Sequence, residues 1–174
     1  MPRLSGVVED LGRIVVQWAH VLSGVLWVGG GFYTTLVQLP ALAAMPMPAR
    51  GPAIAAIAPR QMRYIVQVAG VTIATGILQL FVNPHGRELL TLSTRWSIAI
   101  VAGALMAVIA FGLLRGPLSH AVDRLLATAP IAAAGDEAAG KQVVALRQRI
   151  QRLGYAQLAL GALILAAMVT ARFS

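Results

Sequence analysis

Four long runs of apolar residues, almost free of charge, constrain this chain more than any other feature of its sequence. Each holds about 20 apolar residues, enough to cross a hydrocarbon core of roughly 30 Å as a helix. A bilayer offers backbone N–H and C=O groups no water, so such runs are helical unless a barrel-like alternation of residues is visible, and none is. The predicted spans are residues 14–39, 64–82, 96–114 and 153–170. We therefore expect an all-α integral membrane four-helix bundle, with residues 1–174 as one membrane domain.

Charge and cysteine content narrow the function classes further. Only 11% of the residues are charged, whereas a soluble domain is about a quarter charged. The net charge of +8 would suggest nucleic acid for a soluble protein, but here the arginines flank the spans, where anionic headgroups attract them. We predict the lipid bilayer as a partner and no nucleic acid. The absence of cysteine excludes disulfides, thiolate-bound metals, iron–sulfur clusters and covalently attached haem.

The segments between the spans differ in character. Prolines 40, 46, 48, 52 and 59 predict that Pro40 breaks the first span and that an alanine-rich loop follows it. Residues 128–140 are rich in alanine and glycine and predict a loose loop. From residue 141 to 152 the pattern is amphipathic, because Val143, Leu146 and Ile150 recur at helical spacing. This segment is predicted to extend the fourth helix into the cytoplasm.

Orientation follows from the basic residues beside the spans. The side that holds the first and third connections carries nine, and the side that holds both termini carries five. The nine are Arg50, Arg60, Arg63, Arg115, Arg124, Lys141, Arg147, Arg149 and Arg152. Positive charge accumulates on the cytoplasmic side. We expect both termini outside the cytoplasm, in a bacterial inner membrane.

His20 is the strongest candidate for a functional residue. It lies within the first span, where an ionisable side chain is costly and is by default a functional hypothesis. Ser23 and Gly24 follow at i+3 and i+4, and Trp27 at i+7. The helix face that carries His20 therefore has small side chains next to the histidine and an aromatic side chain beyond them. A neutral imidazole with room beside it suits an axial haem ligand. Small residues on such a face also mark ordinary helix contacts, as they do at Gly103, and this alternative stays open.

Two further side chains are predicted near the level of His20. His85 follows the second span on the same side of the membrane, so it is a candidate second ligand for haem or for a metal, or else a solvated loop residue. Gln79 is predicted to hydrogen-bond the edge of a ligand. His120 follows the third span on the opposite side and cannot share a site with His20.

The segment Trp18–Tyr33, with its pattern W-x-H-x-x-x-x-x-x-W-x-G-G followed by aromatic residues, resembles the first helix of a group of small membrane proteins. The group comprises the copper-resistance protein D family, the membrane domain of cytochrome c-linked urate oxidases and the small haem-containing protoporphyrinogen oxidases. The resemblance implies that His20 ligates haem or a metal. Those families supply a second histidine or a lysine from a later helix, whereas the second to fourth spans here contain neither. This difference disfavours the porphyrinogen-oxidase activity.

Three functions remain as expectations. The first is a small b-type cytochrome-like protein that carries electrons between quinol and an external acceptor such as a cytochrome c, with haem b bound by His20, His85, Ser23, Gly24, Trp27 and Gln79. The second is a non-catalytic transmembrane subunit of a larger respiratory or photosynthetic complex, without a cofactor. The third is a copper-handling membrane protein with His20 and His85 as ligands.

Overall fold

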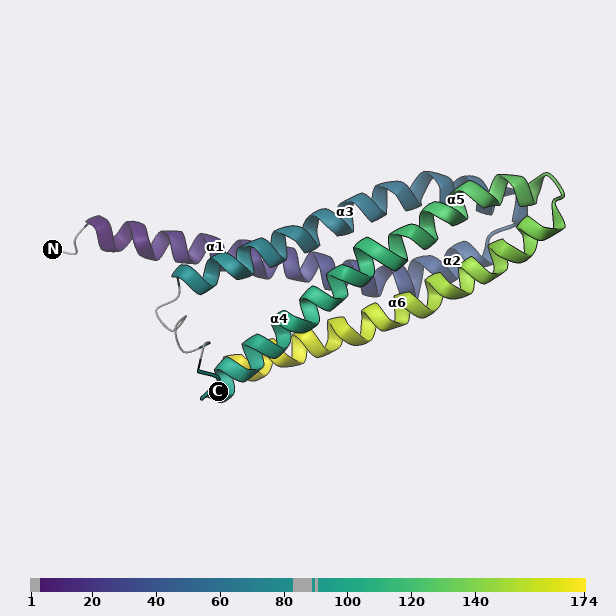
Figure 1. Cartoon of the computed structure of the whole chain (residues 1–174). Helices are drawn as coiled ribbons and strands as arrows, with labels where there is room; N and C mark the ends of the chain where they lie inside the picture. The colour runs from purple at the N-terminus through teal and green to yellow at the C-terminus, as the bar shows by residue number, and fades with distance from the viewer. Residues whose placement is uncertain (1–3, 83–88, 90) are drawn as a thin grey trace.

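The chain folds into long helices that run side by side (Figure 1). The computed structural model describes residues 4–82, 89 and 91–174, and this part of the chain contains no strand. The helices are α1 (Leu4–Tyr33), α2 (Leu39–Ala44), α3 (Met47–Val82), α4 (Arg95–Leu113), α5 (Ser119–Ala133) and α6 (Glu137–Arg172). Two π-helical turns, η1 (Thr34–Gln38) and η3 (Leu114–Leu118), connect α1 to α2 and α4 to α5.

Within the described residues, four helical segments are long and apolar enough to cross a membrane. They are Val8–Ala44, Pro48–Val82, Arg95–Ala133 and Glu137–Arg172, and each contains one of the predicted spans. The expectation of an all-α four-helix membrane bundle is confirmed.

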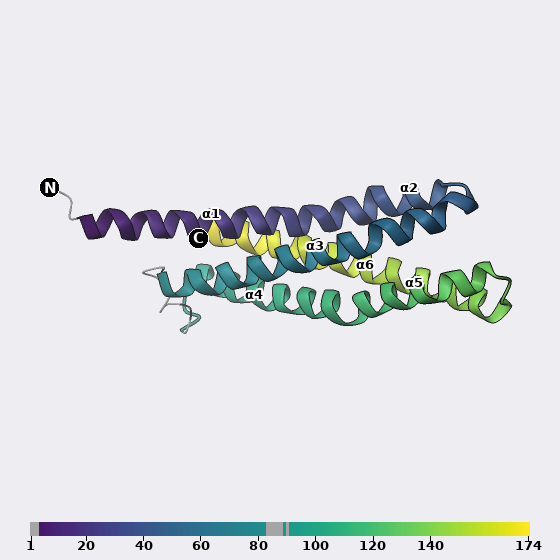
Figure 2. The ribbon, with the colours of Figure 1, turned by 90° about the horizontal axis from the view of Figure 1, so that it is seen from above.

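The four segments form two antiparallel hairpins (Figures 1 and 2). In one, α1, η1 and α2 pack along α3, and in the other, α4, η3 and α5 pack along α6. The hairpins meet in an apolar core that combines residues of α1, α3, α4 and η3: Trp27, Ile65, Ala69, Ala110 and Leu114. Helix α1 begins and α6 ends at the same end of the bundle (Figure 1), as an even number of crossings requires.

The prediction of a loop after the first span is wrong. Only Met45 and Pro46 lie outside a helix between α2 and α3, and two prolines lie inside α3. Proline lacks an N–H, and its ring clashes with the carbonyl four residues earlier in a regular helix. The wider π-helical turn η1 ends two residues before Pro40, and η3 contains Pro117. We infer that these turns relieve the clash, because they shift the hydrogen-bond pattern by one residue.

The predicted loose loop at residues 128–140 is also largely helical. Helix α5 continues to Ala133, and α6 begins at Glu137 after Asp136, whose side chain accepts a hydrogen bond from the Ala139 N–H at 2.8 Å. Alanine is the strongest helix former, and aspartate is a favoured N-cap, so this composition suits two helices with a short turn between them.

The helices are longer than a bilayer is thick. Helices α3 and α6 each have 36 residues, or about 54 Å at 1.5 Å per residue, against roughly 30 Å of hydrocarbon. The rise from Arg95 to Arg115, or from Arg152 to Arg172, is about 30 Å. We therefore expect one membrane surface at the level of the exposed Arg63, Arg115 and Arg152.

Beyond this surface lie α2, α5 and the first halves of α3 and α6. We call this part, residues 39–62 and 116–151, the helical extension. It has a small core of its own, formed by Ala121, Leu125, Val143 and Leu146. The amphipathic pattern predicted for residues 141–152 is confirmed by this core.

Candidate functional site

His20 lies in the contact between α1 and α3. Its Nδ1 is 2.9 Å from the carbonyl oxygen of Thr72 and 3.4 Å from the hydroxyl oxygen of Thr75. Because a carbonyl only accepts, Nδ1 carries the hydrogen of this bond, and in the neutral form of the ring that tautomer leaves the lone pair on Nε2. The ring packs against Gly76, where a Cβ would come within 3.0 Å of the imidazole Cε1. His20 thus bonds the two helices and still presents one nitrogen with ligand character.

Helix α3 packs against the small residues beside His20. Ser23 is buried and donates to the carbonyls of Ala19 and His20 on its own helix. A Cβ at Gly24 would lie 3.6 Å from the methyl group of Thr72, which is an ordinary contact. Gly24 is therefore not a point of exceptionally close approach. The space that the sequence predicted beside His20 is therefore occupied by α3.

The other predicted residues differ from one another in their surroundings. Trp27 is 6% exposed and belongs to the central core between the hairpins. Gln79 lies one helical turn from Gly76, and its Nε2 is buried with no hydrogen-bond partner among the described residues. His85 lies outside the described residues. His120 is exposed on α5, in the helical extension. Among the residues that the structure describes, no group of three or more His, Cys, Asp or Glu side chains is placed to hold a metal.

A cavity lies between the two hairpins, and sequence reasoning did not predict it. It has a volume of about 480 Å³, within the roughly 300–1,000 Å³ of small-molecule sites. Its walls come from α1, η1, α2 and α3 on one side and from α4, η3, α5 and α6 on the other. Of the predicted site residues that the structure describes, it includes only Trp27.

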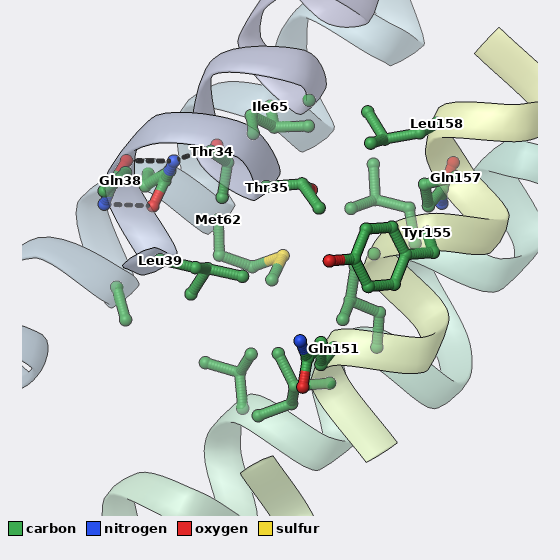
Figure 3. A pocket seen from close by; sticks show the side chains of 18 of the residues that line it. Thr34, Thr35, Gln38, Leu39, Met62, Ile65, Gln151, Tyr155, Gln157 and Leu158 are labelled. Carbon is green, nitrogen blue, oxygen red and sulfur yellow. Dashed lines mark hydrogen bonds between the residues drawn. The ribbon is translucent and has the colours of Figure 1, made fainter. Parts of the chain in front are cut away.

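Figure 3 shows how side chains from the two hairpins face each other across this cavity. Thr35 of η1 and Met62 of α3 point inward from one hairpin, and Tyr155 of α6 points inward from the other, with the Met62 sulfur directed towards the tyrosine. Leu39, Ile65 and Leu158 add apolar surface. The lining is predominantly apolar, with single polar atoms at intervals.

Polar side chains at the cavity wall are mostly paired with one another. The amides of Gln38 and Gln61 exchange two hydrogen bonds, of 2.9 and 2.8 Å (Figure 3). Gln61 also donates to the hydroxyl of Thr34, and Gln157 donates to the Ala110 carbonyl at 2.7 Å. These bonds satisfy buried polar groups beside the π-helical turns. They leave Tyr155, Gln151 and the Thr35 hydroxyl as the polar groups nearest the cavity centre (Figure 3).

The cavity is elongated and open on one side. Its lining on α6 runs from Arg147 to Ile164, about 25 Å along the axis at 1.5 Å per residue. It therefore extends from the membrane core, past the plane of Arg63, Arg115 and Arg152, into the helical extension. Several lining residues of α2 and α6 are exposed, so the opening lies between these helices: Pro40, Ala43, Arg147, Gln151 and Tyr155.

One signal in the sequence pointed to this site. Thr34 and Gln38 stand four residues apart within an apolar run, and Gln61 follows in the segment that was predicted to be a loop.

Comparison with known proteins adds no further guide: no protein-family model matches the chain, and no curated protein or solved structure shows significant similarity to it.

Proposed function

We propose that this protein binds a lipophilic small molecule in the cavity between its two hairpins. The observation that carries the proposal is the cavity itself, an apolar space of about 480 Å³ with few polar groups. Its lining extends about 25 Å along α6. A long apolar space of this kind suits a hydrocarbon chain.

The position of the cavity supports a ligand that comes from the membrane. Its inner end, at Trp27 and Ile164, lies within the apolar spans, and its outer end lies in the helical extension. An amphiphile in the bilayer has the same arrangement, with its chain in the hydrocarbon and its polar group at the surface. The opening between α2 and α6 lies mainly in the helical extension, where it would expose the polar group of such a molecule to water.

Gly31 allows a direct test. It lines the cavity, and a Cβ built on it has no atom within 4 Å, so Gly31→Leu places a side chain in empty space. Gly29 is an exposed glycine on the same helix that also has open space, but it does not line the cavity. Gly29→Leu is therefore the matched control.

The probe is a long-chain alcohol that carries a photoreactive diazirine, and the labelled residues are mapped by mass spectrometry. We expect labelling of η1, α3 and α6 at the cavity in the parent, a several-fold loss in Gly31→Leu and no loss in Gly29→Leu. Labelling confined to the outer faces of the helices, or equal in both variants, would overturn the proposal.

A second candidate function, electron transfer through haem b, rests on His20 and on the resemblance of Trp18–Tyr33. Its specific support is the Nδ1 hydrogen bond to the Thr72 carbonyl. A histidine that ligates a metal commonly donates its other ring nitrogen to a carbonyl or carboxylate. Haem bound there would supply one-electron chemistry, with quinol and an external acceptor such as a cytochrome c as partners.

His20→Asn separates this function from a purely structural histidine. The asparagine amide nitrogen takes the place of Nδ1 and keeps a donor for the Thr72 carbonyl, but no atom replaces Nε2. We expect a visible Soret band in the purified parent, its loss in His20→Asn and an unchanged helical content. A colourless parent, with no haem by pyridine extraction, would contradict the haem assignment.

Two other expectations stay predictions. Copper handling requires a partner for His20, and the candidate, His85, lies outside the described residues. A role as a non-catalytic subunit of a respiratory or photosynthetic complex would be seen as co-purification of that complex. Both the bacterial inner membrane and an orientation with the termini outside the cytoplasm are part of the proposal.

A further inference from the structure

We propose that the ligand of the cavity is a single-chain anionic amphiphile, whose carboxylate or phosphate is bound by Arg50 and Arg147. This inference rests on the proposed binding function and specifies its ligand. Arg50 of α3 and Arg147 of α6 are the cationic side chains among the described lining residues, and both line the part of the cavity that lies in the helical extension.

Arg50 is held in place but incompletely satisfied. One terminal nitrogen, Nη2, donates to the carbonyl of Ala43 and, at 2.8 Å, to that of Met45. These carbonyls lie at the end of α2, where a cation also interacts favourably with the helix dipole. The Nε of Arg50 is buried and has no hydrogen-bond partner among the described residues.

An unpartnered buried donor on a charged group is costly. Nη2, the terminal nitrogen on the side of Nε, already donates to the carbonyls of Ala43 and Met45, so it cannot form a free two-nitrogen fork with Nε. An anionic headgroup at the outer end of the cavity would compensate the charge of Arg50, which no described carboxylate pairs.

No carboxylate competes for this position. The described lining residues include no Asp or Glu, and neither Arg50 nor Arg147 forms an ion pair with a described residue. Over residues 40–63 and 115–152 the chain carries nine Lys and Arg against three Asp and Glu, a net charge of +6. This excess attracts anions to the outer end, because charge of one sign around a cleft concentrates counter-ions there.

The pairing of a cationic outer end with an apolar inner end defines the ligand class. The long apolar cavity takes a hydrocarbon chain, and the cations take one anionic group. A fatty acid and a monoalkyl or isoprenoid phosphate share this chemistry. A neutral alcohol of equal length shares only the chain.

The experiment measures displacement of the diazirine alcohol from the purified full-length protein by three competitors of equal chain length: a fatty acid, a monoalkyl phosphate and a neutral alcohol. In the parent we expect at least one anionic competitor to displace the probe at concentrations about tenfold or more below the alcohol. The anionic competitor that displaces the probe at the lower concentration identifies the preferred headgroup, a carboxylate or a phosphate. High salt is expected to reduce this preference.

Arg50→Gln is expected to abolish the preference and leave displacement by the alcohol unchanged. Because Arg50 also bonds the end of α2, a second variant guards against misfolding. Arg147→Glu changes an exposed side chain without an ion-pair partner among the described residues, and we expect it to weaken the anions several-fold. Arg149→Glu is the matched control, since Arg149 is exposed on the same helix but does not line the cavity.

Equal displacement by all three competitors in the parent would overturn the anionic ligand and leave the proposed function standing. An anionic preference that survives both Arg50→Gln and Arg147→Glu would overturn the assignment of these two arginines. Failure of the probe to label the cavity at all would instead remove the proposed function, so the two failures are distinct.

Discussion

The contact between the two hairpins depends on a glycine of α6, and enlarging it by one methyl group tests the packing. A Cβ at Gly161 would lie 3.1 Å from Cγ1 of Val28 on α1, with Phe32 at 3.8 Å. Val28 is β-branched and has one strongly preferred rotamer in a helix, so it cannot turn aside. Either the side chain leaves its rotamer or α1 and α6 separate by a few tenths of an ångström.

The expected cost follows from two opposing terms. Overpacking of a tight contact costs about 1–3 kcal/mol, whereas replacing glycine by alanine within a helix contributes about 0.5–1 kcal/mol of stability. Gly29→Ala on α1 is the control, because it has the same helix term and open space around its Cβ. The difference between the two variants is the overpacking term alone, about 1–3 kcal/mol.

The measurement is unfolding in mixed micelles by increasing SDS, followed by far-ultraviolet circular dichroism and by the combined fluorescence of Trp18, Trp27 and Trp96. We expect Gly161→Ala to unfold at lower SDS than Gly29→Ala, and Gly161→Leu to prevent docking of the hairpins. Identical transitions for Gly161→Ala and Gly29→Ala would refute the reasoning, because they would mean that α1 and α6 are not in contact at Val28.

Three other outcomes follow from the fold. Gly103→Ala brings a Cβ within 2.5 Å of the Met168 Cε. Since the end of a thioether side chain moves easily, we expect the free energy of unfolding in SDS to fall by about 1 kcal/mol. Gly24→Ala should leave it unchanged, because its Cβ would make an ordinary contact. Asp136→Ala removes the N-cap of α6 and should cost about 0.5–2 kcal/mol, measured as faster amide exchange at residues 137–140. Gly135→Cys should resist an impermeant thiol reagent in intact cells and react after lysis, and labelling from outside would reverse the predicted orientation.

The membrane spans could be predicted from sequence because a hydrophobic run reports directly on its solvent. The part of the helical extension at residues 39–62 could not be predicted, since by local rules its prolines break a helix. Contacts with distant parts of the chain override these local rules. The π-helical turn before Pro40 places Thr34, Thr35 and Gln38 against α3 and α6, where the Gln38–Gln61 pair and the Thr35–Gly154 contact hold it.

The role of His20 in a site stays a prediction, and sequence reasoning did not predict the cavity. His20 stands out in sequence because it is a histidine inside an apolar span, and the structure gives it a specific partner in Thr72. The partner is a backbone carbonyl, which no residue pattern encodes. The cavity is formed by side chains from four separate helical segments, so its shape depends on how the hairpins dock, and a single sequence carries little information on docking.

The two candidate sites lie in different halves of the bundle, and this separation gives each its own test. His20 bonds Thr72 near the end that holds the termini, whereas Thr35, at the cavity centre, is 15 residues along the same segment, or about 22 Å at 1.5 Å per residue. Substitutions more than about 7–10 Å apart without a shared partner act independently. Trp27 is the exception, since it follows His20 by two turns on α1 and also lines the cavity. A Trp27 variant would therefore perturb both sites and distinguish neither, whereas His20→Asn and Gly31→Leu each report on one site.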